Sequence, residues 1–261
     1  MVLPLGSLPS SRDGFYAVNN QFLANGPKGF AEFKMLENED MYIRLDLPGV
    51  PPEGVRIQLD ATRKAVMVFA DAPKDHKYDF SNRAYGTNSG LTCDCCEISG
   101  FTSHMMDGVL RLVLTKTKTA TKTPSCIAFL AGPDYKGGCG SAVHKFPHGS
   151  DPHDPALTGR TLLPHPIVNY GSEMAFESKR LPNGGLFVRV DMPGVPKDQF
   201  SVSVEKGRVT VFGLAPAISH DSSGRIYLGD VAMFSSSVRL PVRRIKTITK
   251  HGIIRLIIPP V

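Results

Sequence analysis

The sequence of 261 residues contains no tryptophan and no apolar run long enough to cross a membrane. Its first residues have neither the basic start nor the apolar stretch of a secretion signal. We therefore expect a protein of the cytoplasm, the nucleus or both, not a secreted or membrane protein. There is no G-x-x-x-x-G-K phosphate loop, no G-x-S-x-G elbow and no H-E-x-x-H pair. These absences argue against the common enzyme classes, and we expect neither catalysis nor a cofactor.

Cysteine is also scarce. There are five cysteines, an odd number, and three of them fall within four positions. Without a secretion signal, this pattern indicates reduced thiols rather than disulfides. Cys93 and Cys96 have the spacing of a zinc-ligand pair, but no second C-x-x-C motif occurs. They are weak candidates for a metal site, and the sequence favours the alternative of reduced, partly buried thiols.

What the sequence does contain is a repeat. Residues 42–59, YIRLDLPGVPPEGVRIQL, recur as residues 187–204, FVRVDMPGVPKDQFSVSV, at an offset of 145 residues. Two more pairs of blocks follow at offsets of 143 and 144, namely 65–70 with 208–213 and 108–114 with 252–258. Three blocks in the same order predict a duplicated domain of roughly ninety residues.

Each copy of the first block predicts a strand, a turn and a second strand. Apolar Ile43, Leu45 and Leu47 alternate with Arg44 and Asp46, which is the period-two pattern of a half-buried strand. A Pro-Gly pair then ends the strand, because proline lacks a ladder N–H and glycine accepts the positive φ of a tight turn. Many such short segments between turns predict an all-β fold of two immunoglobulin-like antiparallel β-sandwiches.

The order of these blocks resembles the α-crystallin domain of small heat-shock proteins, the Hsp20-like family. In that family a strand ending in a D-x-P-G-V turn opens the domain, and a G-V-L block with an aliphatic strand closes it. The matching residues are Asp46, Pro48, Gly49, Val50, Gly108, Val109 and Leu110 in the first copy, and Asp191, Pro193, Gly194, Val195, Gly252, Ile253 and Ile254 in the second.

The resemblance implies a non-enzymatic protein that binds other proteins through strand-edge grooves. Two functions fit it. One is an adaptor for defined partners, as in divergent plant members of a nuclear anti-silencing assembly that acts in DNA demethylation. The other is an ATP-independent holdase that captures unfolding clients. The resemblance also implies pairing, as a dimer or with another Hsp20-like domain. Because no I-x-I tail follows the last strand, we expect no large oligomer.

We predict four segments along the chain. They are an irregular N-terminal arm (1–29), a first Hsp20-like domain (30–117), a Pro/Gly/His-rich linker (118–169) and a second Hsp20-like domain (170–261). In the arm, Phe15, Tyr16 and Phe22 are expected to pack onto the first domain. The linker composition cannot bury enough apolar surface to offset its ordering entropy, so we expect it to be mobile.

Charge is distributed unevenly. The net charge of +6 is the sum of −2 over residues 1–117, +2 over 118–170 and +6 over 171–261. The basic excess therefore belongs to the second copy, where Arg255 and five other residues lie close in sequence. These five could form a patch for an acidic partner: Arg239, Arg243, Arg244, Lys246 and Lys250. The alternative is ordinary outward-facing strand residues. No aromatic ladder accompanies them, so direct nucleic-acid binding is not expected.

Overall fold

The computed structural model describes residues 20–26, 29–91, 95–119 and 167–261 with His165, and the backbone of short strands at 13–17, 128–131 and 148–149. Within these residues the fold is all-β, and the helical elements are two 3₁₀ turns, η1 (Pro52–Gly54) and η3 (Val242–Arg244). Among the described residues, no helix is long and apolar enough to span a membrane. The prediction of an all-β fold is confirmed.

The strands form four small antiparallel sheets. The first has the order β11 (His148–Gly149), β1 (Asp13–Ala17), β3 (Gly29–Met35), β4 (Met41–Asp46), β9 (Val109–Lys118), β8 (Cys96–Met106). The second has the order β10 (Ala128–Ala131), β7 (Arg83–Leu91), β6 (Ala65–Ala72), β5 (Val55–Leu59), and β12 (Val168–Tyr170) also pairs with β7.

Two further sheets follow in the chain. The third has the order β13 (Phe176–Arg180), β14 (Leu186–Asp191), β19 (Ile253–Ile258), β18 (Lys246–Lys250). The fourth has the order β15 (Phe200–Glu205), β16 (Arg208–Ala215), β17 (Arg225–Met233), β2 (Leu23–Asn25). The four sheets together can also be read as a four-bladed, propeller-like ring, so their grouping into two sandwiches is taken up below as a proposal.

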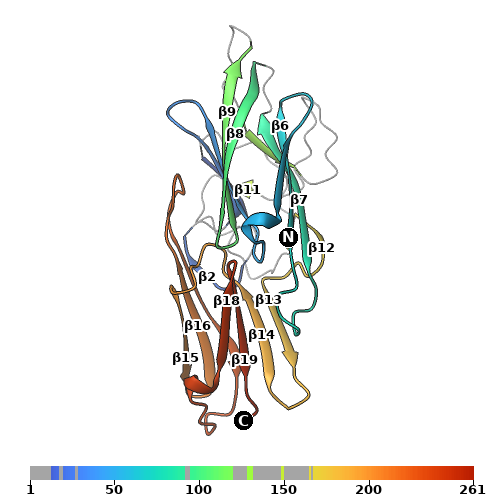
Figure 1. Ribbon diagram of the computed structural model, residues 1–261. Helices are drawn as coiled ribbons and strands as arrows, with labels where there is room; N and C mark the ends of the chain where they lie inside the picture. Colours follow the sequence, from blue (N-terminus) through green and yellow to red (C-terminus); the bar gives the residue numbers. More distant parts are fainter. Residues whose placement is uncertain are drawn as a thin grey trace.

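Two hydrophobic cores lie between these sheets. The first core contains Leu45 and Leu112 from the first sheet and Val68 from the second. The second core contains Val188 from the third sheet and Val211 from the fourth. We call β3 to β9 the first half and β13 to β19 the second half. The first half lies above the second in Figure 1.

Strand order is the same in the two halves. The order β3-β4-β9-β8 corresponds to β13-β14-β19-β18, and β7-β6-β5 corresponds to β17-β16-β15. The alternation seen in the sequence explains the faces: in β16, Val209 and Val211 are buried while Arg208 and Phe212 are exposed.

Two segments before the halves do not stay with the half that follows them. β2 precedes the first half but pairs with β17 of the second, and β12 precedes the second half but pairs with β7 of the first. The expectation that Phe22 packs onto the first domain is therefore wrong, because this residue is 1% exposed in the second core. Likewise Ile167, from the predicted linker, is fully buried in the first core.

Candidate functional site at the junction of the two halves

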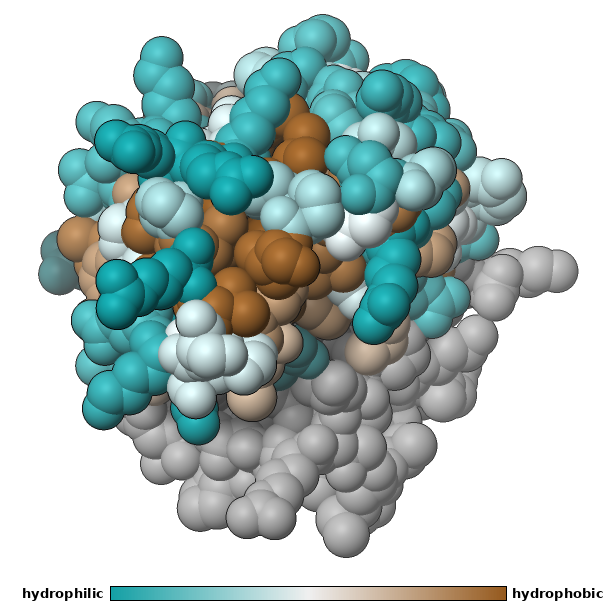
Figure 2. All heavy atoms as spheres, turned by 90° about the horizontal axis from the view of Figure 1, so that it is seen from below, coloured by the Kyte–Doolittle hydropathy of each residue, from teal (hydrophilic) through white to brown (hydrophobic). Residues whose placement is uncertain are grey.

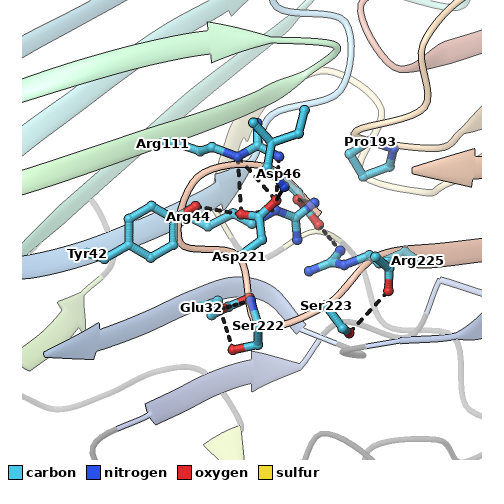
Figure 3. A network of polar contacts seen from close by, with 12 residues as sticks. Glu32, Tyr42, Arg44, Asp46, Arg111, Pro193, Asp221, Ser222, Ser223 and Arg225 are labelled. Atoms are coloured by element: carbon cyan, nitrogen blue, oxygen red, sulfur yellow. Dashed lines mark hydrogen bonds and ion pairs between the residues drawn. The ribbon is translucent and has the colours of Figure 1, made fainter. Parts of the chain in front are cut away.

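The weak metal candidates do not form a site in the part of the chain that the structure describes. Cys96 is fully buried in the first core, and its sulfur lies 3.7 Å from that of the buried Cys95. Cys93 lies outside the described residues. No group of three or more potential metal ligands occurs among the residues with described side chains. The densest polar network lies instead where the two halves meet (Figure 3).

The turns of the predicted family motif meet at this junction. The Gly49 N–H donates to the carbonyl of His251 at 2.8 Å, and the Gly194 N–H donates to the carbonyl of Asp107 at 2.8 Å. Each acceptor directly precedes a motif glycine. Gly108 has φ +70°, and a Cβ there would lie 2.5 Å from the His251 carbonyl oxygen. A side chain is excluded both by the backbone conformation and by the facing half.

The remaining motif residues anchor these turns. Tyr85 donates its hydroxyl hydrogen to the Pro48 carbonyl at 2.7 Å, and Tyr227 donates to the Pro193 carbonyl at 2.9 Å. The aliphatic motif residues are buried with exposures of 0–1%: Val50, Val109, Leu110, Val195, Ile253 and Ile254. The motif therefore has a structural role, since it shapes and supports the junction.

Two buried ion pairs cross the junction. Arg225 donates to Asp46 at 2.5 Å, and Arg83 donates to Asp191 at 2.6 Å. All four side chains are at most 6% exposed. Burial alone would lower the pKa of Arg225, but the adjacent Asp46 carboxylate more than offsets this and raises the pKa above its ordinary value. The pKa of Arg83 is raised in the same way by its own carboxylate partner.

A loop from each half inserts a second carboxylate into the other half. Asp221, after β16, accepts from Arg111 at 2.7 Å and from the Tyr42 hydroxyl at 2.5 Å. Asp79, after β6, accepts two hydrogen bonds from Arg255 at 2.8 and 3.0 Å. Burial raises the pKa of Asp221, but the hydrogen bond from Arg111 and the other nearby donors outweigh it and lower the pKa overall.

The two loops differ in the residue that follows the aspartate, which is Ser222 after Asp221 and Phe80 after Asp79. Ser222 donates its backbone N–H and its hydroxyl to Glu32, at 2.8 and 2.6 Å, and accepts from Lys34 at 2.9 Å. The corresponding loop residue of the first half is Phe80, whose ring lies 5.9 Å from the ammonium of Lys179. Lysine thus contacts the loop on both sides, once through a hydroxyl and once through an aromatic ring.

The crossing segments close the junction. Asn20 donates its amide to the Asp191 carbonyl at 2.9 Å, and the His165 Nε2 lies 3.0 Å from the Asp46 carbonyl oxygen. These two residues stand 145 positions apart, which is the offset of the first repeat block. His165 packs against the rings of Phe30 and Tyr85 at 5.2 and 5.4 Å. Burial, followed by the charge of the nearby Arg83, lowers its pKa to about 4.

Sequence reasoning missed the crossing segments and the ionic network. Identity between residues 20–26 and 165–171 is low, and the alternation there is too short to mark a strand. A signal was nevertheless present: Gly26 and Gly171, and further on Glu32 and Glu177, are identical at the offset of 145 residues. Both glycines have positive φ, +99° and +97°, and lie against the facing half's backbone.

The predicted acidic-partner patch stays a prediction, and the structure gives the positions of its residues. Arg239, Arg243, Arg244 and Lys246 are exposed. Lys250 is also exposed but pairs with Asp75 of the first half at 2.8 Å. Arg255, which the sequence grouped with them, is 1% exposed and belongs to the junction instead.

Open strand edges are the remaining candidate for binding. In the described sheets, β5 and β8 are end strands of the first half, and β13, β15 and β18 are end strands of the second half. Apolar side chains beside these edges are only half-buried: Val55, Ile57 and Leu59 on β5, and Phe200, Val202 and Val204 on β15. Figure 2, which shows the molecule from below, has apolar side chains gathered near the centre of the view with hydrophilic ones on several sides.

Comparison with known proteins relates the chain to heat shock proteins of plants. The family described as "predicted plant small heat shock protein" matches residues 2–261. A 57 kDa heat shock protein from Arabidopsis thaliana is 40% identical over 84% of this chain and 55% of its own length. The mitochondrial heat shock 22 kDa protein from Pisum sativum is 28% identical over 38% of this chain and 48% of its own length.

The chain thus spans about half the length of these two relatives, 55% and 48% respectively. The family match covers almost every residue, including both halves and both crossing segments. On this evidence the chain belongs to the plant small heat shock protein family.

Proposed function

We propose that this protein is a non-enzymatic, Hsp20-like adaptor made of two α-crystallin-type β-sandwiches, with domains at 30–117 and 170–261. The two separate cores, each drawing side chains from two sheets, support this grouping. So does the equal strand order of the two halves. A duplicated domain that keeps one set of edges per copy offers two binding surfaces in one chain.

The observation that carries the proposal is the pair of open edges that both halves have in the same place, at β5 and β8 in the first half and at β15 and β18 in the second. An unpaired edge presents backbone N–H and C=O groups that a partner can extend by adding a strand. The half-buried apolar side chains on β5 and β15 would contact alternate residues of that added strand. A partner segment in extended conformation with apolar residues at every second position fits these edges best.

Charge favours one partner chemistry at the second half. The turn η3 lies against β15 and leads into β18, and its Arg243 and Arg244 are exposed beside these edges. Lys246, the first residue of β18, is exposed as well. We therefore propose an apolar strand flanked by acidic residues as the ligand of the second half. Binding through exposed charges should weaken as ionic strength rises, because they are screened over about 8 Å at physiological salt.

A holdase function is the second candidate, and the heat shock names of the relatives favour it. A holdase would use the same edges for many unfolding proteins, whereas an adaptor would use them for a few defined partners. The nuclear anti-silencing assembly suggested by the sequence resemblance remains one proposed setting for the adaptor, in the nucleus rather than the cytoplasm.

The experiment is capture from native plant extract with the full chain as bait, before and after heating, followed by mass spectrometry. An adaptor should retain a short, heat-independent set of proteins, and a long heat-dependent set would establish the holdase instead. The variant Arg243→Glu/Arg244→Glu should reduce capture in low salt. The matched control Arg180→Glu/Lys197→Glu changes the same charge on exposed residues elsewhere in the second half. Equal capture by both variants would exclude the basic edge as the binding site.

A further inference from the structure

We propose that the junction is a pairing surface whose partner is the chain's own other half. In this view the two halves recognise each other as two separate proteins would, and the closed junction excludes a second Hsp20-like domain. The proposal concerns a face different from the open edges. Its failure would therefore leave the proposed adaptor function untouched.

The first argument is that the contacts are reciprocal. Four kinds of contact across the junction occur twice, with the roles of the halves exchanged. The pairs are Arg225–Asp46 with Arg83–Asp191, Asp221–Arg111 with Asp79–Arg255, Gly49–His251 with Gly194–Asp107, and Asn20–Asp191 with His165–Asp46. Such two-fold reciprocity is the geometry by which two copies of one protein form a closed dimer.

The second argument is that the junction is closed. The loop aspartates are buried between the halves, with 3% side-chain exposure for Asp221 and 2% for Asp79. The outer edges of β7 and β17 are occupied by the crossing strands β12 and β2. A second domain would have to displace both loops and both crossing strands before it could make the same contacts.

The third argument is that the first half is matched to the second half rather than to another copy of itself. Glu32 is 1% exposed and accepts two hydrogen bonds from Ser222. If two first halves paired, Phe80 would stand at that loop position. The buried carboxylate would lose the bond from the hydroxyl, because phenylalanine has no side-chain donor, and Lys34 lies 3.2 Å away. Leaving a buried charge short of donors is strongly unfavourable, so this pairing is disfavoured.

The covalent connection adds to this preference. Tethered binding surfaces meet at an effective concentration of millimolar order, so a separate partner at micromolar concentration competes at about a thousandfold disadvantage. The half in the same chain is therefore the expected occupant, and a second copy of the chain is the alternative that the experiment must detect.

The experiment uses the full chain with a specific protease site replacing residues 136–142. The engineered chain must first show the melting temperature of the natural chain. After complete cleavage at micromolar concentration, the two pieces should co-elute as one particle of the original size. Elution as two separate pieces would overturn the proposal.

Variants then test which contacts hold the pieces together. Arg83→Ala removes a buried donor that crosses the junction at 2.6 Å and should weaken association of the cleaved pieces at least tenfold. The matched control Arg56→Ala removes an exposed ion pair within the first half, with Asp71 at 3.1 Å, and should not change it. If Arg83→Ala fails to fold, two other variants are compared instead. One is the single variant Arg255→Gln, and the other is the double variant Asp79→Asn/Arg255→Gln. The cleaved pieces of the double variant should associate more tightly than those of the single variant, because only the single variant leaves a buried Asp79 carboxylate without its arginine.

Mixing tests the alternative occupant. The cleaved, untagged pieces are incubated with an excess of intact, tagged chain, and the tagged material is recovered. The proposal expects no untagged piece in the recovered fraction. Transfer of either piece into the tagged chain would show that a second copy competes for the junction, and would overturn the claim that it is closed.

Discussion

Replacing His165 by asparagine should remove a large part of the acid sensitivity of this fold. The side chain is 8% exposed, and its Nδ1 is buried with no hydrogen-bond partner among the described residues. The neutral imidazole, with its hydrogen on Nε2, can donate to the Asp46 carbonyl 3.0 Å away. A second proton would add a charge and an unpaired donor between Phe30 and Tyr85, and so the pKa falls to about 4.

The sign and size of the effect follow from proton linkage. An unfolded histidine titrates near pH 6.5, so below that pH the unfolded chain binds a proton that the folded chain excludes. His165 therefore costs no stability above pH 6.5, and stability falls as the pH drops from 6.5 toward 4. The difference between 6.5 and about 4 amounts to about 3 kcal/mol when fully expressed. At pH 5 the loss should be about 2 kcal/mol.

The Asn variant makes this measurable. Asparagine stands at the equivalent position 20, where its amide reaches the facing carbonyl at 2.9 Å, so the hydrogen bond can be kept. The smaller side chain leaves space beside the two rings and should cost about 1 kcal/mol at pH 7.5. His165→Asn should therefore be less stable than the natural chain at pH 7.5 and more stable at pH 5.

The assay is urea unfolding followed by circular dichroism between pH 4.5 and 8. Other groups contribute to the pH dependence: burial lowers the pKa of His76 and His251 and raises that of Asp107. These contributions cancel in the difference between the two proteins. His104→Asn, at an exposed position, is the control and should follow the natural chain. If the natural chain and His165→Asn give parallel curves, the assignment of the buried imidazole is refuted.

Three other predictions can be checked with single variants or a labelling reaction. Gly252→Val should lower the free energy of unfolding by at least about 3 kcal/mol, because φ is +67° and a side chain there would meet the Asp107 carbonyl. Lys250→Ala should change it by less than about 1 kcal/mol, and equal melting temperatures would contradict this ranking. Tyr42→Phe removes one buried donor to the Asp221 carboxylate and should cost about 1–2 kcal/mol in the same unfolding assay. An unchanged unfolding midpoint would contradict this prediction. Cys95 and Cys96 should resist a thiol reagent in the native protein and react in denaturant, as mapped by mass spectrometry, since they are 4% and 0% exposed; rapid native labelling would show that they are accessible.

Several features were predictable from the sequence because they depend on local pattern. Alternating residues such as Ile43 and Leu45 fix which face of a strand is buried, and this alone predicts an all-β chain. A Pro-Gly pair before a positive φ fixes the turn at Gly49, which the structure has at +92°. The resemblance to the Hsp20-like family rested on such turns, and membership of the plant small heat shock family bears that part out.

Only the tertiary structure decided what the charged residues do. Arg44, Asp46 and Arg255 read in the sequence as outward-facing strand residues, because a strand pattern distinguishes two faces but does not say what covers the outer one. Here the facing half covers it, and a polar face becomes a buried ionic junction. The same limit hid the crossing of β2 and β12. The partner of a strand edge is set by contacts with residues far away in the chain, such as Tyr85 for Val168 and Ile226 for Asn25, and not by neighbours in the sequence.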